Sequence, residues 1–240
     1  MSSPSKIDVV ILAGGLGTRL REVVPDVPKP MAPVAGRPFL DILLGTLDGK
    51  PWVGKVVLAV GRMSGQIFEA YRLRKEYSFG IFFSIEEKPL GTGGAVRLAL
   101  DRTETPEVLV LNGDSFVEVD WEGFIDNHRR RGYPMSLVLR HVDETGRYGQ
   151  VVLDDRGRVV RFEEKRESAG PGLVNSGAYL FERRLLAGIS PGRKVSLEVD
   201  LMPEFLKEGV GGFVTDGRFI DIGTPESYRY AQRYLEDKAQ

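Results

Sequence analysis

The 240-residue chain has no cysteine and only two histidines, His128 and His141. The absence of cysteine excludes disulfide bonds, thiolate nucleophiles and cysteine-rich zinc sites. Two histidines far apart in the sequence argue against a histidine-based metal centre, and we expect each of them at a surface or an edge. The chain also lacks a dominant charge, because 33 lysines and arginines face 34 aspartates and glutamates, for a net charge of −1. Such a protein has no strong field for nucleic acid, so we expect no nucleic-acid partner.

Long apolar runs are absent as well. No stretch approaches the roughly 20 apolar residues that a bilayer-spanning helix needs. The first ten residues lack the basic start and the apolar core of a secretory signal. We therefore expect a cytoplasmic protein with no membrane partner. The hydrophobic fraction of 42% and the charged fraction of 28% are typical of a soluble globular protein.

The chain does contain a glycine-rich stretch near its N-terminus. Branched apolar residues at 9–12 predict a buried strand, which leads into the segment Ala13-Gly14-Gly15-Leu16-Gly17-Thr18-Arg19. Three glycines let several backbone N–H groups approach one anion. Arg19 and Lys29 add cationic side chains that suit a polyphosphate. These features predict a nucleoside triphosphate site. The alternative is an ordinary glycine-rich turn that carries two solvated cations.

Two common phosphate motifs do not fit this stretch. A P-loop ends in Gly-Lys and then Ser or Thr, whereas Gly17 is followed by Thr18 and Arg19, and the dinucleotide fingerprint needs a glycine where Leu20 stands. The pattern Gly-x-Gly-Thr-Arg, nine residues and then Lys-Pro does fit, and it resembles the sugar-1-phosphate nucleotidyltransferases. The resemblance runs from Val9 to about Tyr230, with five separated motifs in the order of that family.

Strands and helices alternate along the first half of the chain. Apolar runs predict strands at 55–60, 81–85 and 108–111, and helical spacing appears at 38–48, at 66–75 and from 93 onward. This alternation predicts an α/β fold: a single-domain, Rossmann-like three-layer α/β/α arrangement with a mostly parallel central sheet. Ligands of such sheets bind beyond the carboxyl ends of the strands.

The second half changes character. It predicts strands at 135–142, 149–164 (with a hairpin turn at 154–157), 173–181, 212–216 and 219–222, and helices at 121–131, 197–207 and 225–236. We expect one domain over residues 1–240. Residues 1–120 would bind the nucleotide, and residues 121–240 would add a small mixed β part for the sugar phosphate and a C-terminal helix capped by Thr224.

Two aspartates stand at the ends of predicted strands. Asp114 follows the strand at 108–111, and Asp221 lies just before the last helix. Mg²⁺ prefers oxygen ligands and commonly takes one or two protein carboxylates. Family members carry a metal-binding aspartate in each segment, so the resemblance implies a Mg²⁺ cofactor held by Asp114 and Asp221. We expect both to follow strands of the same sheet, and the alternative for either is a turn or cap residue.

The resemblance also implies three catalytic residues, Arg19, Lys29 and Asp114. The planar fork of Arg19 suits the β- and γ-phosphates as pyrophosphate leaves. Lys29 is expected near the α-phosphate or the sugar phosphate, where charge builds in the transition state. A sugar phosphate is already an anionic nucleophile. The reaction therefore needs positioning and electrostatics rather than a protein nucleophile.

The segment Leu90-Gly91-Thr92 resembles the base-binding segment of the family. Glu86 falls where uridylyl- and thymidylyltransferases commonly carry a glutamine. A carboxylate only accepts hydrogen bonds, so it can take both adjacent donors of guanine, N1–H and the 2-amino group. Glu86 thus favours GTP; Glu87 is the alternative reader, and a solvated charge cluster is the simpler interpretation. The predicted nucleotide-binding residues are Leu12, Ala13, Gly14, Gly15, Gly17, Thr18, Arg19, Glu86, Gly91, Thr92 and Asp114.

Two later segments resemble the sugar-binding elements of the family. Glu164-Lys165 resembles its Glu-Lys element, although Arg166 stands where a proline often follows. Asn175-Ser176-Gly177 resembles an element whose asparagine binds sugar hydroxyls, and an amide suits a polyol because it both donates and accepts. The predicted sugar-phosphate-binding residues are Lys29, Asn112, Gly113, Glu164, Lys165 and Asn175.

Within the family, the motifs look most like the heptose 1-phosphate guanylyltransferases, which make GDP-heptose for bacterial surface polysaccharides. Mannose-1-phosphate guanylyltransferases come next, and uridylyl- or thymidylyltransferases third. The implied partners are GTP and a sugar 1-phosphate, and a homodimer is plausible for the family. A non-catalytic sugar-nucleotide-binding subunit is the alternative from another class. Such subunits typically lack one of the charged positions that Arg19, Lys29, Asp114, Lys165 and Asp221 occupy here.

Overall fold

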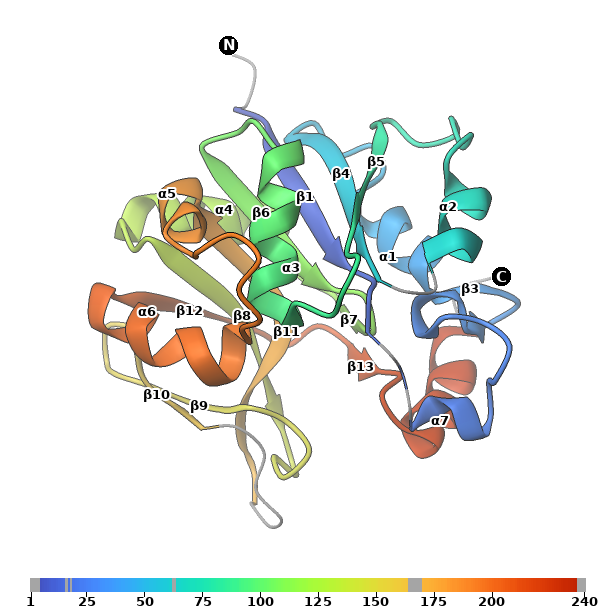
Figure 1. The fold of residues 1–240 in the computed structure, drawn as a ribbon. Helices are drawn as coiled ribbons and strands as arrows, with labels where there is room; N and C mark the ends of the chain where they lie inside the picture. The colour runs from blue at the N-terminus through green and yellow to red at the C-terminus, as the bar shows by residue number, and fades with distance from the viewer. Residues whose placement is uncertain (1–4, 16, 18, 62–63, 164–169, 237–240) are drawn as a thin grey trace.

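A nine-stranded sheet forms the centre of the molecule (Figure 1). The computed structural model describes residues 5–15, 17, 19–61, 64–163 and 170–236. Four strands from the first half lie in the order β5 (Ile81–Ile85), β4 (Val53–Val60), β1 (Ile7–Leu12) and β6 (Glu107–Asn112). All three pairings among them are parallel. The predicted Rossmann-like α/β arrangement is confirmed.

The second half extends the same sheet. The long strand β11 (Gly172–Glu182) runs antiparallel to β6, to β8 (Met135–Val142) and to β9 (Gln150–Leu153). β10 (Val159–Glu163) forms the predicted hairpin with β9, and β12 (Val210–Thr215) lies parallel to β8. The assignment of residues 1–240 to one domain, with a nucleotide half and a sugar half, stays a prediction.

Short strands lie outside the central sheet. β2 (Pro33–Val34) and β3 (Arg37–Pro38) form a hairpin. β13 (Phe219–Asp221) follows β12 in the chain, but it pairs with β7 (Ser115–Val117), which comes directly after β6. This small ribbon carries the C-terminal segment to the edge where the parallel strands end.

Helices cover both faces of the sheet. Along β1, Val9 and Ile11 face one core, while Val10 faces the other. The first core packs α1 (Phe39–Leu47), α2 (Ser64–Tyr71), α4 (Trp121–Arg131) and α7 (Pro225–Glu236). The second packs α3 (Gly91–Ala99), α5 (Arg183–Ala187) and α6 (Met202–Glu208), and α3 lies in front of the sheet in Figure 1. The result is the expected three-layer arrangement.

Helix boundaries follow local capping signals where those are strong. Asp120 caps α4 by accepting a hydrogen bond from the N–H of Gly123 at 3.0 Å, and Gly132 ends it with φ of 68°. Thr224 caps α7 as predicted, because its hydroxyl accepts from the N–H of Ser227 at 3.2 Å. Two other helices differ from their predictions. The helix expected over 66–75 ends at Tyr71, and the one expected over 197–207 begins as a π-helical turn, Leu197–Leu201.

The expectation of two peripheral histidines is wrong for His128 and right for His141. His128 is only 2% exposed, and its Nδ1 lies 2.8 Å from the hydroxyl of Ser136 on β8. Burial lowers the pKa of His128, which keeps the ring neutral. His141 is exposed. None of the helices in the described ranges is both long and apolar enough to cross a membrane.

Candidate active site

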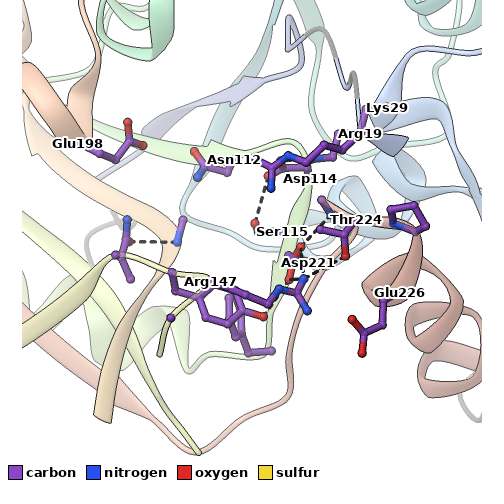
Figure 2. Close-up of a pocket in the computed structure, with 18 of the residues that line it drawn as sticks. Arg19, Lys29, Asn112, Asp114, Ser115, Arg147, Glu198, Asp221, Thr224 and Glu226 are labelled. Carbon is purple, nitrogen blue, oxygen red and sulfur yellow. Dashed lines mark hydrogen bonds and ion pairs between the residues drawn. The ribbon is translucent and has the colours of Figure 1, made fainter. Parts of the chain in front are cut away.

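Two cavities lie beyond the carboxyl ends of the parallel strands and share Asn112 and Asp114 in their walls. One, of about 720 Å³, is lined by the segments that follow β1, β4, β5 and β6, and we call it the base cavity. The other, of about 790 Å³, also takes residues from the second half of the chain, and we call it the sugar cavity (Figure 2). Asn112 ends β6, and Asp114 lies in the turn between β6 and β7.

The base cavity contains most of the predicted nucleotide-binding residues. Those that line it are Leu12, Gly14, Gly15, Glu86, Gly91, Thr92 and Asp114. Ala13 lines neither cavity, and its N–H donates to the carbonyl of Ala59 at 2.8 Å rather than facing an anion. Gly17 is also absent from both walls, and Thr18 lies outside the described residues.

Glu86 is held in place at the wall of the base cavity. Its Oε2 accepts a hydrogen bond from the N–H of Leu90 at 2.7 Å. A side chain at Gly14 would place its Cβ 2.8 Å from Glu86 Oε1, so the glycine makes room for the carboxylate. Burial raises the pKa of Glu86. Glu87 lines the same cavity, so both predicted base readers remain candidates.

Lys29 reaches the loop shared by the two cavities because the glycine loop makes room for it. Gly17 has φ of +57°, and a Cβ there would lie 2.9 Å from the Cβ of Lys29. The ammonium nitrogen of Lys29 lies 2.5 Å from Asp114 Oδ2, and the lysine side chain is 12% exposed. Arg19, the other predicted cation, is an exposed residue of the sugar cavity wall.

Asp114 and Asp221 come together by a route that the sequence did not indicate. The expectation that both follow strands of one sheet is wrong, because Asp221 ends β13 in the separate two-stranded ribbon. That ribbon sets Asp221 opposite Ser115, and the N–H of Ile222 donates to the carbonyl of Asp114 at 2.9 Å. The antiparallel pairing of β13 with β7 therefore delivers the second carboxylate.

Asp221 already has several hydrogen-bond donors around it. Its Oδ2 accepts from the hydroxyl of Tyr148 at 2.8 Å and from the guanidinium of Arg147 at 3.2 Å, and Oδ1 accepts from Ser227 Oγ at 3.1 Å. Burial and the charge of Asp221 raise the pKa of Tyr148, so its hydroxyl stays a donor. Arg147 and Tyr148 were not predicted as site residues. Their setting between Gly146 and Gly149, in a loop between strands, was the available signal.

Asn175 lies in the sugar cavity as predicted. Its Oδ1 accepts from the N–H of Gly177 at 3.1 Å, and its amide nitrogen donates to the hydroxyl of Tyr179 at 2.7 Å. Glu198, on the π-helical turn, lies in the same wall and was missed, since nothing in its local sequence distinguishes it from a solvated glutamate. Glu164 and Lys165 lie outside the described residues.

Asn112 presents an unusual feature at the point where the two cavities meet. Within the described ranges, its Oδ1 is the one buried side-chain oxygen or nitrogen with no hydrogen-bond partner. Leaving a buried acceptor unpaired costs about 1–3 kcal/mol, and such atoms are commonly found where a ligand or water completes the site. Asn112 and Gly113 were predicted to contact the sugar phosphate, and the unpaired oxygen is consistent with that prediction.

Two cavities that meet at cations and carboxylates fit the class of enzymes that bring two phosphorylated substrates together. Residues 8–238 match the model of the nucleotidyl transferase family, and the chain belongs to that family. The resemblance predicted from the motifs is therefore confirmed.

Three guanylyltransferases of known name match most of this chain. The chain is 37% identical over 231 residues to the D-glycero-alpha-D-manno-heptose 1-phosphate guanylyltransferase of Aneurinibacillus thermoaerophilus, covering 96% of this chain and 99% of the relative. It is 36% identical to the protein of that name from Campylobacter jejuni, covering 92% and 97%. It is 35% identical to the mannose-1-phosphate guanylyltransferase of Mycobacterium tuberculosis, covering 93% of this chain and 63% of that one.

Two solved structures superpose on most of this chain. HddC from Yersinia pseudotuberculosis, crystallised with GMP-PN, superposes with a TM-score of 0.84 at 36% identity, over 95% of this chain and 99% of that one. A putative glucose-1-phosphate thymidylyltransferase from Bacillus anthracis reaches a TM-score of 0.81 at 20% identity, which shows a common fold.

Proposed function

We propose that this protein transfers GMP from GTP to D-glycero-α-D-manno-heptose 1-phosphate, giving GDP-heptose and pyrophosphate. The observation that carries the proposal is the pair of cavities that share Asn112 and Asp114. A nucleotide in one cavity and a sugar phosphate in the other would meet at these residues. The names of the relatives at 36–37% identity, and the complex of the structural neighbour with GMP-PN, support this pair of substrates.

The reaction we propose is an in-line displacement at phosphorus. An oxygen of the sugar phosphate forms a bond to the α-phosphorus of GTP, and the bond from that phosphorus to the β-bridging oxygen breaks, releasing pyrophosphate. Lys29, held near the junction by its contact with Asp114, offsets charge on the reacting phosphates. Arg19, exposed in the sugar cavity wall, is suited to the departing pyrophosphate.

Mg²⁺ is the cofactor we propose. The donor set fits it, because Asp114 and Asp221 supply carboxylate oxygens and Mg²⁺ needs only one or two from the protein. No cluster of three or more acidic or histidine side chains occurs in the described part of the chain. The ammonium of Lys29 contacts Asp114 and also lies near Asp221. Gly223 marks this second approach, because a Cβ there would lie 2.7 Å from Asp221 Oδ1 and 3.5 Å from the Lys29 nitrogen. When bound, the metal would supply positive charge at the phosphate oxygens.

Glu86 supports guanine as the base. Its carboxylate lines the base cavity, and Gly14 and Leu90 fix its direction. An ionised carboxylate accepts from two adjacent donors, which guanine offers and uracil does not. On the sugar side we propose contacts from Asn112, Asn175 and, outside the described ranges, from Glu164 and Lys165.

Pyrophosphate release tests the proposal. The purified protein would be incubated with Mg²⁺, with GTP, UTP or dTTP, and with heptose or mannose 1-phosphate in separate reactions. We expect GTP with the heptose 1-phosphate to give the highest kcat/KM. No release with any pair would contradict the transferase assignment and favour a binding protein.

Mannose 1-phosphate is the second candidate acceptor. The relative from M. tuberculosis is a mannose-1-phosphate guanylyltransferase at 35% identity, close to the values for the heptose relatives. The two sugars share their ring hydroxyl pattern and differ at the exocyclic carbon. A cytoplasmic location, a role in surface polysaccharide biosynthesis and a homodimer remain further parts of this proposal.

A further inference from the structure

Glu198 connects the base cavity to the sugar cavity. Its Oε2 accepts from the hydroxyl of Thr92 at 2.8 Å, and Thr92 lines the base cavity. Its Oε1 accepts from the hydroxyl of Tyr179 at 3.0 Å, and Tyr179 in turn accepts from Asn175 of the sugar cavity. One carboxylate therefore links residues that line the two binding sites (Figure 2 shows Glu198 on the side of the sugar cavity away from Glu226).

We call the hydrogen bonds from Thr92 through Glu198 to Tyr179 and Asn175 the link, and several bonds hold it on the side of the base cavity. The hydroxyl of Thr92 donates to Glu198 and accepts from the N–H of Leu197 at 2.8 Å, so this hydroxyl is committed to the link rather than to a nucleotide. Backbone bonds reinforce it, because the N–H groups of Gly93 and Gly94 donate to the carbonyl of Val195 at 2.9 and 3.2 Å. These bonds join the start of α3 to the segment that leads into the π-helical turn.

Two hydrogen bonds also define the link on the side of the sugar cavity. Tyr179 is 0% exposed, and its hydroxyl donates to Glu198 at 3.0 Å and accepts from the amide nitrogen of Asn175 at 2.7 Å. A hydroxyl has one proton, so the bond to Glu198 fixes the direction in which the phenol donates. Burial and the charge of Glu198 raise the pKa of Tyr179, so the phenol keeps the proton it donates. The amide of Asn175 is thus held on one side by the phenol of Tyr179 and on the other by the N–H of Gly177.

The π-helical turn places Glu198 in this position. Ser196 caps the turn, since its hydroxyl accepts from the N–H of Val199 at 3.2 Å and also donates to Glu198 Oε2 at 3.0 Å. Single π-turns are rare and occur frequently at functional sites. A regular α-helical turn would rotate the glutamate differently relative to Thr92 and Tyr179.

We propose that Glu198 is a positioning residue that couples the two cavities, because it ties the base loop at Thr92 to Tyr179 and so orients the amide of Asn175. This inference rests on the proposed function, in which that amide binds the sugar. It assigns Glu198 a role in setting the affinity for the sugar 1-phosphate according to the position of the base loop. Glu198 itself acts through its neighbours.

The decisive variants are Thr92→Val and Tyr179→Phe, each made in the wild type and in Glu198→Ala. KM for the sugar 1-phosphate and for the nucleotide, and kcat, would be measured with the substrate pair that the wild type uses best. We expect Thr92→Val to raise the KM for the sugar phosphate about 5- to 10-fold, although it lies in the base cavity, with kcat changed much less. In Glu198→Ala the same substitution should have no further effect on that KM.

Non-additivity distinguishes coupling from local damage. The double variant Thr92→Val/Tyr179→Phe, with Glu198 present, should raise the KM for the sugar 1-phosphate by clearly less than the product of the two single effects. The reason is that each substitution alone already breaks the hydrogen-bonded link through Glu198. Glu198→Gln should recover most of the loss seen in Glu198→Ala, since its amide can accept from Tyr179 and donate to Thr92. Thr46→Val, which removes a hydroxyl bonded at 2.7 Å to the carbonyl of Leu43 in its own helix, is the matched control.

Two results would overturn the inference. One is a KM for the sugar 1-phosphate that Thr92→Val leaves unchanged. The other is that Thr92→Val and Tyr179→Phe change this KM by the same factors in the wild type and in Glu198→Ala. The proposed function is tested separately, on the wild type, by the identity of the nucleotide and sugar that release pyrophosphate. If Glu198→Ala does not fold, the Thr92→Val, Tyr179→Phe and Glu198→Gln comparisons still decide.

Discussion

Replacement of Lys29 by methionine should remove most of the turnover and leave the fold almost unchanged. Methionine keeps the length of the side chain and its packing against Gly17, and it removes the charge that lies 2.5 Å from Asp114. Loss of one group that stabilises developing charge typically costs about 100- to 1,000-fold in kcat. We expect an effect in that range, mainly on kcat.

Lys29→Met should lower the stability of the fold only slightly, because the ion pair that it removes is partly exposed to solvent. Asp114 is 37% exposed, so solvent screens the ion pair, and such pairs contribute only about 0–1 kcal/mol. For a chain of this size, a loss of 1 kcal/mol lowers the melting temperature by about 2–4 °C. Thermal unfolding followed by circular dichroism would measure it.

A matched control separates the two effects. Lys55 also makes an ion pair, to Glu104 at 2.8 Å, and its side chain is 21% exposed, but it lies away from both cavities. Lys55→Met should therefore keep near-wild-type kcat with a similar small change in melting temperature. If Lys29→Met kept more than about a fifth of wild-type kcat, the assignment of Lys29 to the reacting phosphates would be refuted.

Three further substitutions test other parts of the site. Gly17→Ala should lower kcat at least about 10-fold by displacing Lys29, whereas Gly36→Ala, which also has positive φ (+77°) but open space around it, should lose stability only. Glu86→Gln should reduce the ratio of kcat/KM for GTP over UTP about 10- to 100-fold, with Glu87→Gln as the control, and an unchanged ratio would exclude Glu86 as the base reader. Burial raises the pKa of Glu86, so KM for GTP should rise as pH falls through that raised pKa, and Glu86→Gln should lose this dependence. Asp221→Asn should raise the Mg²⁺ concentration for half-maximal rate at least about 10-fold, and an unaltered titration would remove Asp221 from the proposed metal site.

The pH dependence of Glu86 has a defined sign for folding as well. Its pKa is higher in the folded protein than in the unfolded chain, because burial disfavours the charged form. Its contribution to stability is therefore complete below the unfolded pKa and is lost as pH rises through the raised folded pKa. Ionisation of the carboxylate that would read guanine therefore comes at some cost to the stability of the fold.

Much of the fold could be predicted because its signals are local. The strands that become β1, β4, β5 and β6 are short runs of apolar residues, and parallel strands covered on both faces need that composition. The helix predicted over 121–131 has the same bounds as α4, where Asp120 caps the start and Gly132 follows the end. The glycine-rich motif was also recognisable, since its residues are adjacent in the sequence.

The parts that could not be predicted depend on tertiary pairing. Asp221 meets Asp114 through a ribbon of two three-residue strands, β7 and β13, that lie about 100 residues apart in the chain. Periodicity cannot report such a pairing, because a strand of three residues carries too little pattern. Arg147 and Glu198 were missed for a related reason: their partners come from distant segments.

His128 shows the opposite error. His128 was expected at a surface or an edge, yet α4 packs that face onto β8, and the hydroxyl of Ser136 lies 2.8 Å from the ring nitrogen Nδ1. Helical spacing places His128 four residues after the buried Phe124, on the same face. That spacing was the signal that should have predicted a buried ring.

A competition assay tests the central claim most directly. The protein would receive Mg²⁺, equal amounts of GTP and UTP, and equal amounts of heptose 1-phosphate and mannose 1-phosphate, and mass spectrometry would identify the nucleotide sugars formed early in the reaction. Product ratios then report the ratios of kcat/KM. We predict that GDP-heptose forms as the main product. A mixture dominated by a UDP-sugar would contradict guanine selection by the base cavity, and one dominated by GDP-mannose would contradict the heptose assignment.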